Sequence, residues 1–376
     1  MTVDPPGGPI VEARQISVGY GRTLVIDGLD LTVAAGEMVV LLGPSGSGKT
    51  TILAAIAGFV PIRSGELRIS GRTVASAHRQ EPPERRDVAV VFQASALWPH
   101  LSAIDTVAYP MRRRGMPVAA AGREARAILE RFGIEHLADR RPAEMSGGEQ
   151  QRVGLGRAVA RGAALQLFDE PTAHLDGPLR DRLLEEIATT RRETGAAGIY
   201  ATHDTAEALA IADRVALIRA GRVVQVGSPI EVYDAPVDGW AARLTGPASE
   251  LDAVVIGPVA DQTELDFAGV RVRADVAGGG EAGVRAGAGA GGGGSGSGVM
   301  AGPIRLLVRP DWVTLGGPLP GRVSGLRFRG SHTDVELTTP AGSLTIRRPG
   351  SPSVALGDAP GWTLLRARRL GADPPA

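Results

Sequence analysis

The chain of 376 residues contains no cysteine. This absence excludes disulfides, thiolate metal sites and cysteine nucleophiles, and it is compatible with a reducing compartment such as the cytosol. Aromatic residues are also scarce at 4 %, whereas hydrophobic residues make up 43 %. The core must therefore be built mainly from Val, Leu, Ile and Ala, which favours layered α/β packing. A length of this size also predicts two or three domains.

An excess of either charge is missing, as are long hydrophobic runs. The formal net charge is zero and the basic run 112–114 is the longest one, so nucleic acid is not expected as a partner. Apolar runs such as 38–42 and 51–60 are shorter than the roughly 20 residues of a membrane span. The first ten residues lack the apolar core of a secretory signal, and we expect them to be a flexible tail. Any role at a membrane requires another chain to supply the span.

Lysine is nearly absent too, because Lys49 is the single lysine among 41 Lys and Arg residues. It lies in GPSGSGKT, residues 43–50, which follows the apolar strand pattern 38–42 and precedes a helix-forming stretch. This context makes the match to G-x-x-x-x-G-K-[ST] a prediction of a phosphate-binding loop. Backbone N–H groups and the helix N-terminus would converge on phosphate, Lys49 would reach the β- and γ-phosphates, and Thr50 would bind Mg²⁺. A compact ammonium suits such a loop better than the wide fork of arginine.

Short apolar strands alternate with helical patterns over residues 11–240, which is typical of βαβ units around a mostly parallel sheet. We expect buried strands at 38–42, 88–92, 164–168 and 198–202, a hairpin at 214–226, and a helical subdomain inserted at about 94–160. The strand at 164–168 is followed by Asp169 and Glu170, which predicts an acid on Mg²⁺ and an acid beside the attacking water.

The pattern changes after about residue 245 to β-like segments bounded by Gly or Pro. They predict a small all-β accessory domain over 246–376, with barrel or OB-like closure. The stretch 278–298 is almost all glycine, alanine and serine. It cannot bury enough apolar area to order itself, so we expect a flexible loop there.

The segment MSGGEQQRVGLGRAVA, residues 145–160, resembles the signature motif of ATP-binding-cassette (ABC) ATPases. Other parts of that family follow in its order over residues 11–240: Tyr20, Gln93, Asp176 and His203. The resemblance implies a P-loop NTPase fold of the ABC type and an ATPase activity dependent on Mg²⁺. It implies that ATP is bound by Tyr20, Gly43, Pro44, Ser45, Gly46, Ser47, Gly48, Lys49, Thr50, Thr51, Ser146, Gly147, Gly148 and Asp176.

The resemblance also implies the catalytic roles. Catalysis would involve Lys49, Gln93, Glu170 and His203, and Mg²⁺ would be held by Thr50, Gln93 and Asp169. In the family Ser146, Gly147 and Gly148 contact the nucleotide of the other subunit, which implies a homodimer with ATP between its subunits.

Several positions depart from the family pattern without removing a catalytic group. Gln166 places an amide in the strand before Asp169, Gly154 and Gly156 replace the commoner alanine in the signature helix, and Met145 and Glu149 vary the signature. We expect all of them to be packing adjustments.

The segment 91–115 resembles the permease-facing stretch of importer ATPases, so we expect a membrane permease to dock near Trp98. Segments 227–236, 306–315 and 321–342 resemble importers that have a C-terminal TOBE-like domain and act with an extracytoplasmic solute-binding protein. The resemblance implies a peripheral position on the cytoplasmic face of the plasma membrane. Ferric iron or a polyamine- or quaternary-amine-like cation is the favoured cargo, and thiamine, sulfate or sugar is the alternative.

Two functions of other classes remain open from the sequence. A soluble ABC ATPase acting on nucleic acid or ribosomes is opposed by the neutral charge, by the single set of motifs and by the permease-facing stretch. A regulatory module that binds ATP without hydrolysing it is opposed by the presence of Glu170 and His203.

Overall fold

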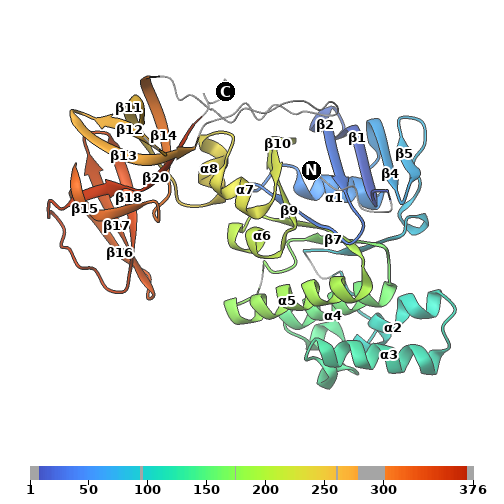
Figure 1. The fold of residues 1–376 in the computed structure, drawn as a ribbon. Coiled ribbons are helices and arrows are strands. Elements are labelled where there is room, and N and C mark those ends of the chain that lie inside the picture. The colour runs from blue at the N-terminus through green and yellow to red at the C-terminus, as the bar shows by residue number, and fades with distance from the viewer. Residues whose placement is uncertain (1–7, 94–95, 174, 260, 278–300, 371–376) are drawn as a thin grey trace. The chain divides into compact units, whose positions relative to one another are not determined.

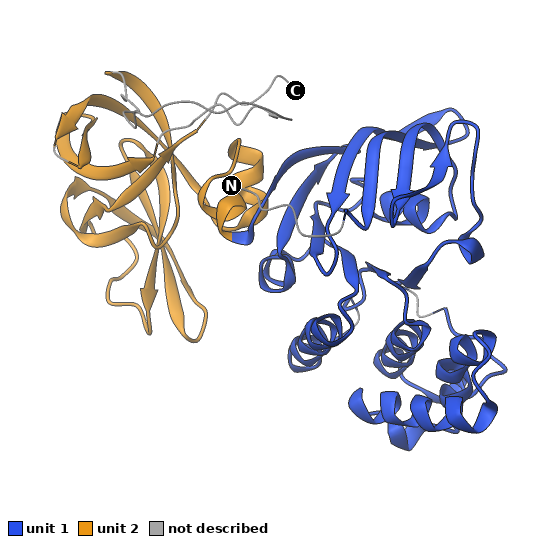
Figure 2. Cartoon of the chain, turned by 45° about the vertical axis from the view of Figure 1, so that its right-hand side comes forward, with its two compact units in different colours: residues 1–229 blue, residues 230–376 orange. Residues whose placement is uncertain are grey.

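The computed structural model describes residues 8–93, 96–173, 175–259, 261–277 and 301–370 (Figure 1). The first seven residues of the predicted tail and the glycine-rich loop 278–298 lie outside these ranges. The chain divides into two compact units, Met1–Pro229 and Ile230–Ala376 (Figure 2). The sequence placed the end of the first domain near residue 240, whereas the segment 230–245 belongs to the second unit.

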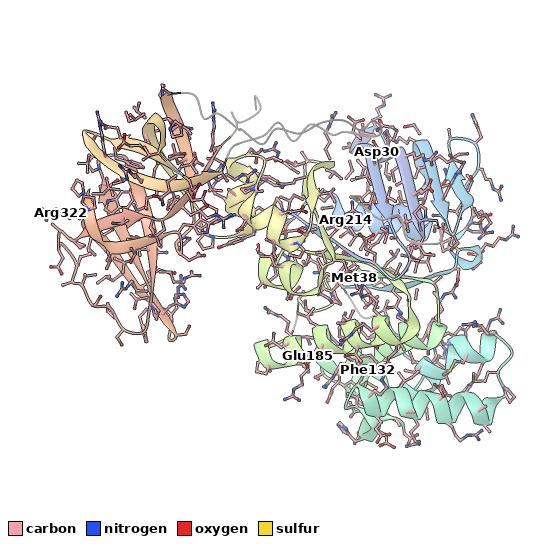
Figure 3. All side chains as sticks on the ribbon, viewed as in Figure 1. Asp30, Met38, Phe132, Glu185, Arg214 and Arg322 are labelled. Carbon is pink, nitrogen blue, oxygen red and sulfur yellow. The ribbon has the colours of Figure 1, made fainter. Side chains whose placement is uncertain are left out.

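A six-stranded sheet forms the centre of the first unit, in the order β10-β9-β3-β8-β7-β6. All neighbouring pairs are parallel except β9 and β10, which form the predicted hairpin. Met38 and Arg214, labelled in Figure 3, begin the adjacent strands β3 and β9. The strands are β3 (Met38–Leu42), β6 (Val88–Val91), β7 (Leu165–Asp169), β8 (Ala197–Thr202), β9 (Arg214–Arg219) and β10 (Arg222–Gly227).

A second sheet, with four antiparallel strands in the order β2-β1-β4-β5, was missed in the sequence. It consists of β1 (Val11–Tyr20), β2 (Thr23–Val33), β4 (Ile62–Ile69) and β5 (Arg72–Ser76). Its central pairing joins β1 to β4 across the whole phosphate-loop segment. Such a non-local pairing leaves no short-range signal in the sequence, unlike a tight hairpin turn.

Helix α1 (Lys49–Ala57) contacts strands of both sheets. One buried cluster joins its Ile52 and Ile56 to Val39 and Leu41 of β3 and to the antiparallel sheet. Because side chains alternate along a strand, Val40 and Leu42 lie on the opposite face of the central sheet. Helix α6 (Thr205–Ile211) contacts β3 and β8.

The insertion between β6 and β7 is helical and holds α2 (Ala103–Arg113), α3 (Val118–Arg131) and α4 (Gly147–Arg161), with short 3₁₀ turns at Glu135–Leu137 and Pro142–Glu144. A third 3₁₀ turn, Pro83–Arg85, precedes β6, and α5 (Gly177–Thr194) follows β7. Gly156 permits close packing of these helices, because a Cβ there would lie 3.2 Å from both Ile128 and Val107.

The second unit begins with two short helices, α7 (Pro229–Asp234, starting at the last residue of the first unit) and α8 (Gly239–Thr245). A closed five-stranded barrel, β11-β12-β13-β20-β14, follows, with a two-stranded and a three-stranded sheet beside it. The predicted barrel closure is therefore confirmed. The strands are β11 (Ser249–Val259), β12 (Gln262–Phe267), β13 (Val270–Ala277), β14 (Gly302–Val308), β15 (Val313–Pro320), β16 (Arg322–Phe328), β17 (His332–Thr339), β18 (Gly342–Pro349), β19 (Gly361–Leu364) and β20 (Arg366–Arg369).

Arg309 joins the short helices to the barrel. Its side chain is fully buried, its guanidinium lies 4.2 Å from the centre of the Tyr233 ring, and its Nη2 donates to the Tyr233 carbonyl oxygen at 2.7 Å. Nη1 donates to the carbonyl oxygens of Ala242 and Gly246 at 2.8 and 3.1 Å. Burial lowers the pKa of Arg309. The carbonyl oxygens compensate for part of the desolvation of the charge.

Candidate active site

The loop 43–48 joins the end of β3 to the start of α1 and has a backbone that requires glycine. Gly46 and Gly48 have φ angles of 78° and 104°, a region that other residues rarely adopt. At Gly43 an added Cβ would lie 2.4 Å from the carbonyl oxygen of Ile218. The strand, loop and helix therefore form the structural context that the sequence motif requires for phosphate binding.

Lys49 is 5 % exposed at the first residue of α1. Its Nζ donates to the carbonyl oxygens of Gly43 and Pro44, at 2.7 and 3.0 Å. Burial lowers the pKa of Lys49, although Glu170 and Asp169 oppose that shift. The ammonium thus lies inside the loop, held by neutral carbonyls that anionic phosphate oxygens could replace with stronger, charge-assisted bonds.

Thr50 and Asp169 meet at the carboxyl end of β7. The Thr50 hydroxyl donates to Asp169 Oδ1 at 3.0 Å. Burial raises the pKa of the Asp169 carboxyl, while the hydrogen bond from Thr50 opposes that shift. No cluster of three or more His, Cys, Asp or Glu side chains suited to a metal ion occurs in the described part of the chain. One carboxylate with one hydroxyl still fits Mg²⁺, which commonly takes its remaining ligands from phosphates and water.

Glu170 and His203 follow the ends of the adjacent strands β7 and β8. His203 Nδ1 lies 3.1 Å from Glu170 Oε1, and the Glu170 side chain is 17 % exposed. Glu170 has a φ angle of +45°, and its N–H donates to the carbonyl oxygen of Ala201 at 3.0 Å. A non-glycine residue in this region is strained and persists only where its surroundings hold it.

A cavity of about 400 Å³ lies beside the phosphate loop, and Glu170 lines it, whereas Asp169 and His203 do not. The structure brings the phosphate loop, the acid Glu170 and Gln93 of the segment after β6 to its wall. Tyr20 is 53 % exposed and is not among the lining residues. The cavity is lined by Val25, Ser45, Gly46, Gly48, Lys49, Thr50, Thr51, Gln93 and Glu170.

The signature residues Ser146, Gly147 and Gly148 do not line this cavity. Ser146 is the N-cap of α4: its N–H donates to Glu149 Oε2 at 2.7 Å, and its Oγ accepts from the Glu149 N–H at 3.4 Å. Glu149 is therefore a capping residue, and our expectation that it is a packing adjustment is wrong. Asp176 is likewise an N-cap, of α5, and accepts from the Leu179 N–H at 3.0 Å.

Gln166 is 4 % exposed, so an amide lies at a buried position of β7. Met145 is buried too, at 8 %. Nothing in the described part of the structure explains why an amide stands at position 166.

Glu207, a carboxylate on α6 that is 4 % exposed, was not among the residues expected from the sequence. It accepts hydrogen bonds from Thr172, Tyr200 and Thr202. The one sequence signal was an acid within the apolar stretch 206–212, since acids in such stretches are rarely buried without partners.

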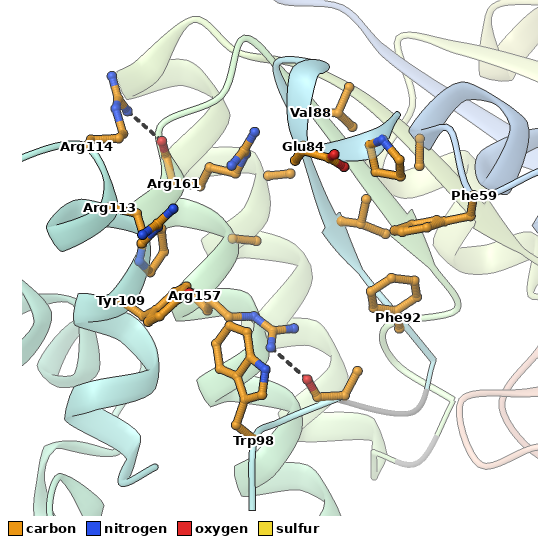
Figure 4. A pocket seen from close by; sticks show the side chains of 17 residues that line it. Phe59, Glu84, Val88, Phe92, Trp98, Tyr109, Arg113, Arg114, Arg157 and Arg161 are labelled. Atoms are coloured by element: carbon orange, nitrogen blue, oxygen red, sulfur yellow. Dashed lines mark hydrogen bonds between the residues drawn. The ribbon is translucent and has the colours of Figure 1, made fainter. Parts of the chain in front are cut away.

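A larger cavity, of about 680 Å³, lies between the helical insertion and the edge of the central sheet (Figure 4). The Trp98 and Tyr109 rings are 4.8 Å apart on its wall. The Arg157 guanidinium lies 5.2 Å from the centre of the Trp98 ring and donates to the Ala96 carbonyl oxygen at 2.7 Å. Phe59 and Phe92 line the other side, so the cavity has an aromatic wall with a basic rim of Arg113, Arg114, Arg157 and Arg161, beside Glu84, the single acid among the described residues that line it.

Comparison with known proteins matches residues 26–173 to the ABC transporter family and residues 306–361 to the TOBE domain. The Fe(3+) ions import ATP-binding protein FbpC of Agrobacterium fabrum is 36 % identical over 350 residues, covering 92 % of each chain. The chain belongs to the ABC transporter ATPases. The predicted fold, an ABC ATPase domain followed by a β-rich TOBE domain, is thereby confirmed, as is an ATPase activity coupled to transport.

Other relatives of this ABC ATPase match over a shorter range. The sn-glycerol-3-phosphate import ATP-binding protein UgpC of Vibrio vulnificus is 42 % identical over 221 residues, 59 % of this chain and 58 % of the relative. Among solved structures, the ATP-binding cassette MJ0796, a dimer in a post-hydrolysis state bound to ADP and Pi, has a TM-score of 0.54 and 26 % identity. The match covers 58 % of this chain and 98 % of the MJ0796 chain.

Proposed function

We propose that this ABC ATPase energises the import of ferric iron through a separate membrane permease. The support is the extent of similarity: two ferric-iron import relatives match over 92 % and 93 % of this chain, including its C-terminal unit. The glycerol-phosphate relative from Vibrio vulnificus matches over 59 %. A polyamine- or quaternary-amine-like cation is the second candidate cargo, and thiamine, sulfate or sugar is the third.

We propose that ATP hydrolysis takes place at the cavity where the phosphate loop faces Glu170. The observation that carries this proposal is the contact between His203 and Glu170 at 3.1 Å, beside the buried Lys49. Glu170 would accept a proton from a water molecule while the oxygen of that water attacks the γ-phosphorus. The bond between the γ-phosphorus and the β–γ bridging oxygen breaks, which gives ADP and phosphate. His203 would hold Glu170 and the γ-phosphate in register, and Gln93 would sense the phosphate from the cavity wall.

Lys49 would leave the carbonyl oxygens of Gly43 and Pro44 to contact the β- and γ-phosphates. Thr50, Asp169 and Gln93 would hold Mg²⁺, which when bound supplies positive charge to the phosphate oxygens. Tyr20, exposed at the end of β1, would stack on adenine. The remaining loop residues, Pro44, Ser45, Ser47 and Thr51, would complete the phosphate contacts.

The active form that we propose is a homodimer. Ser146, Gly147 and Gly148 lie outside the cavity of their own chain, which is compatible with contacts to the nucleotide of a partner subunit. Asp176 would contribute at the same interface. The similar structure of MJ0796 is dimeric.

The permease would dock at the cavity beside Trp98, where an aromatic wall and a basic rim suit an amphipathic helix. None of the helices in the described part of the chain combines the length and the hydropathy of a membrane span. We place the protein peripherally on the cytoplasmic face of the plasma membrane, with a solute-binding protein on the other side of the permease.

Iron uptake in intact cells tests the cargo. A deletion of the gene is expected to reduce accumulation of radioactive iron supplied as iron(III), and the wild-type chain but not Glu170→Gln is expected to restore it. Uptake of glycerol 3-phosphate is the control and should be unchanged. If the deletion lowers uptake of the phosphate ester, a polyamine or a sugar instead, the iron assignment is wrong and that solute replaces it.

A further inference from the structure

Glu207 holds three hydroxyl groups around one buried carboxylate. Oε1 accepts from the Thr172 hydroxyl at 2.6 Å, and Oε2 accepts from the Thr202 hydroxyl at 2.9 Å and the Tyr200 hydroxyl at 3.1 Å. Burial raises the pKa of Tyr200, so its phenol remains a donor. A buried carboxylate is costly unless several donors surround it, and here these donors come from two different segments.

Those two segments carry the groups of the active site. Thr172 lies two residues after Glu170, and Thr202 lies directly before His203. The Thr202 hydroxyl also accepts from the Asp204 N–H at 2.9 Å, so its side chain restrains the backbone on both sides of His203. The carboxylate of Glu207 therefore links the loop after β7 to the carboxyl end of β8, directly before His203.

Arg180 of α5 strengthens this link from outside. Its Nε lies 3.3 Å from Glu207 Oε1, and its Nη1 donates to Asp204 Oδ2 at 3.2 Å. The guanidinium is about one-third exposed, so we expect the larger effect from the buried hydroxyls.

We propose that Glu207 is a positioning residue that keeps Glu170 and His203 in register through the hydroxyls of Thr172 and Thr202. The pairing of β7 with β8 ends at Asp169 and Ala201, so the two catalytic side chains lie just beyond the sheet. Glu170 is also strained, with a φ of +45°. The hydrogen bonds of Glu207 to Thr172, after β7, and to Thr202, the last residue of β8, supply the restraint that both residues need. The inference rests on the roles proposed above for Glu170 and His203.

Isosteric substitutions in the full-length chain test this role. Thr172→Val and Thr202→Val remove a hydroxyl but preserve shape, while Thr172→Ser and Thr202→Ser preserve the hydroxyl. We expect each valine variant to lower kcat for ATP about 10- to 100-fold, since small misplacements of reacting groups have effects of that order. KM for ATP should stay within about twofold, because the phosphate loop is untouched, and the serine variants should retain most of kcat.

Thr190→Val is the matched control. Thr190 is also buried, at 1 % exposure, and its hydroxyl accepts from Arg131 at 3.1 Å, away from the cavity. This variant should lose a similar amount of thermal stability and keep its kcat. If all three valine variants lose kcat equally, and the loss matches the fraction of each protein that is unfolded, the proposal is overturned.

A double-mutant cycle tests whether Glu207 is the link. In a Glu207→Gln background the two valine substitutions should have little further effect on kcat, whereas in the wild-type background each lowers it. If the valine substitutions lower kcat by the same factors in the Glu207→Gln background as in the wild type, the carboxylate does not transmit their effects. That result would overturn the proposal.

The NMR signals of the His203 ring give a readout that needs no turnover. His203 is one of six histidines and is assigned with His203→Gln. We expect Thr202→Val and Glu207→Gln to shift these signals in the nucleotide-free protein, and unchanged signals would contradict the proposal. Glu170→Gln is measured in parallel. If this variant hydrolyses ATP at the normal rate, the proposed role of Glu170 fails. If it is inactive while the Glu207 and threonine variants hydrolyse ATP at the normal rate, only the present inference is refuted.

Discussion

The Thr50 hydroxyl donates to Asp169 Oδ1 at 3.0 Å, although the two residues are 119 positions apart in the chain. The first is the second residue of α1, directly after Lys49, and the second ends the strand β7. Their meeting places one hydroxyl and one carboxylate at the point where a metal-bound phosphate would sit. The balance between stability and function at Asp169 leads to the first prediction.

Asp169→Asn is expected to stabilise the nucleotide-free protein at pH 7 and to abolish hydrolysis. Burial raises the pKa of Asp169 in the folded protein above its unfolded value, so ionisation above that folded pKa reduces folding stability. The neutral amide removes that effect. The difference in Tm between variant and wild type should therefore be largest at neutral pH and should shrink as pH falls through the folded pKa. An equal difference at pH 7 and at pH 4 would show that ionisation is not its cause.

Glu170→Gln should lower kcat at least about 100-fold, the usual contribution of a general base, while leaving ATP binding intact. With ATP and Mg²⁺ present, it should elute as a dimer in size-exclusion chromatography, because hydrolysis no longer opens the closed state. Glu185→Gln, on the exposed part of α5, is the control and should behave as wild type. A Glu170→Gln variant with normal turnover would remove Glu170 from the role of base.

Lys49 is the only lysine, so an amine-directed reagent has two targets, Lys49 in the phosphate loop and the N-terminus. Burial lowers the pKa of Lys49, so a larger fraction is the reactive free amine at pH 8 than for an ordinary lysine. Mass spectrometry should find Lys49 labelled slowly without nucleotide and at least about tenfold more slowly with Mg-ATP. The N-terminus is the internal control, and labelling of Lys49 that ATP leaves unchanged would contradict our account of the loop.

Trp98→Asp should weaken association with the permease at least about tenfold and spare ATP binding by the isolated chain. An acid would break the ring contact with Tyr109 and place a charge on the aromatic wall of the cavity. Trp98→Phe should retain much of the association. Val118→Asp changes a 68 % exposed side chain on α3 and is the matched control. Copurification with the permease measures the effect, and normal recovery with Trp98→Asp would move the docking site elsewhere.

Arg309→Met should destabilise the second unit by roughly 3 kcal/mol, because it leaves the buried carbonyl oxygen of Ala242 and the partly buried carbonyl oxygens of Tyr233 and Gly246 without their charged donor. Calorimetry of the full chain should show a lower transition for this unit and an unchanged affinity for ATP. Arg305→Met, at a side chain that is 60 % exposed, should have little effect. Loss of ATP binding in Arg309→Met would mean that the two units do not unfold independently.

Four features could be predicted from the sequence alone: the phosphate loop, the acids at the end of β7, the positions of the buried strands along the chain and the β-rich character of the C-terminal part. These features are local: a glycine pattern, a hydrophobic run or a change in period is visible within a dozen residues. The single lysine was informative for the same reason, since its neighbours in the chain form the loop around it.

Which distant groups meet depends on the tertiary structure. The antiparallel sheet pairs β1 with β4 across the phosphate loop, and Glu207 collects hydroxyls from Thr172, Tyr200 and Thr202. Glu149 was likewise misassigned until its hydrogen bonds with Ser146 identified a capping box. Pairings of this kind depend on how the strands are ordered and on which face of the sheet each side chain lies. That order results from the packing of the whole domain, whereas a motif records only its own neighbourhood.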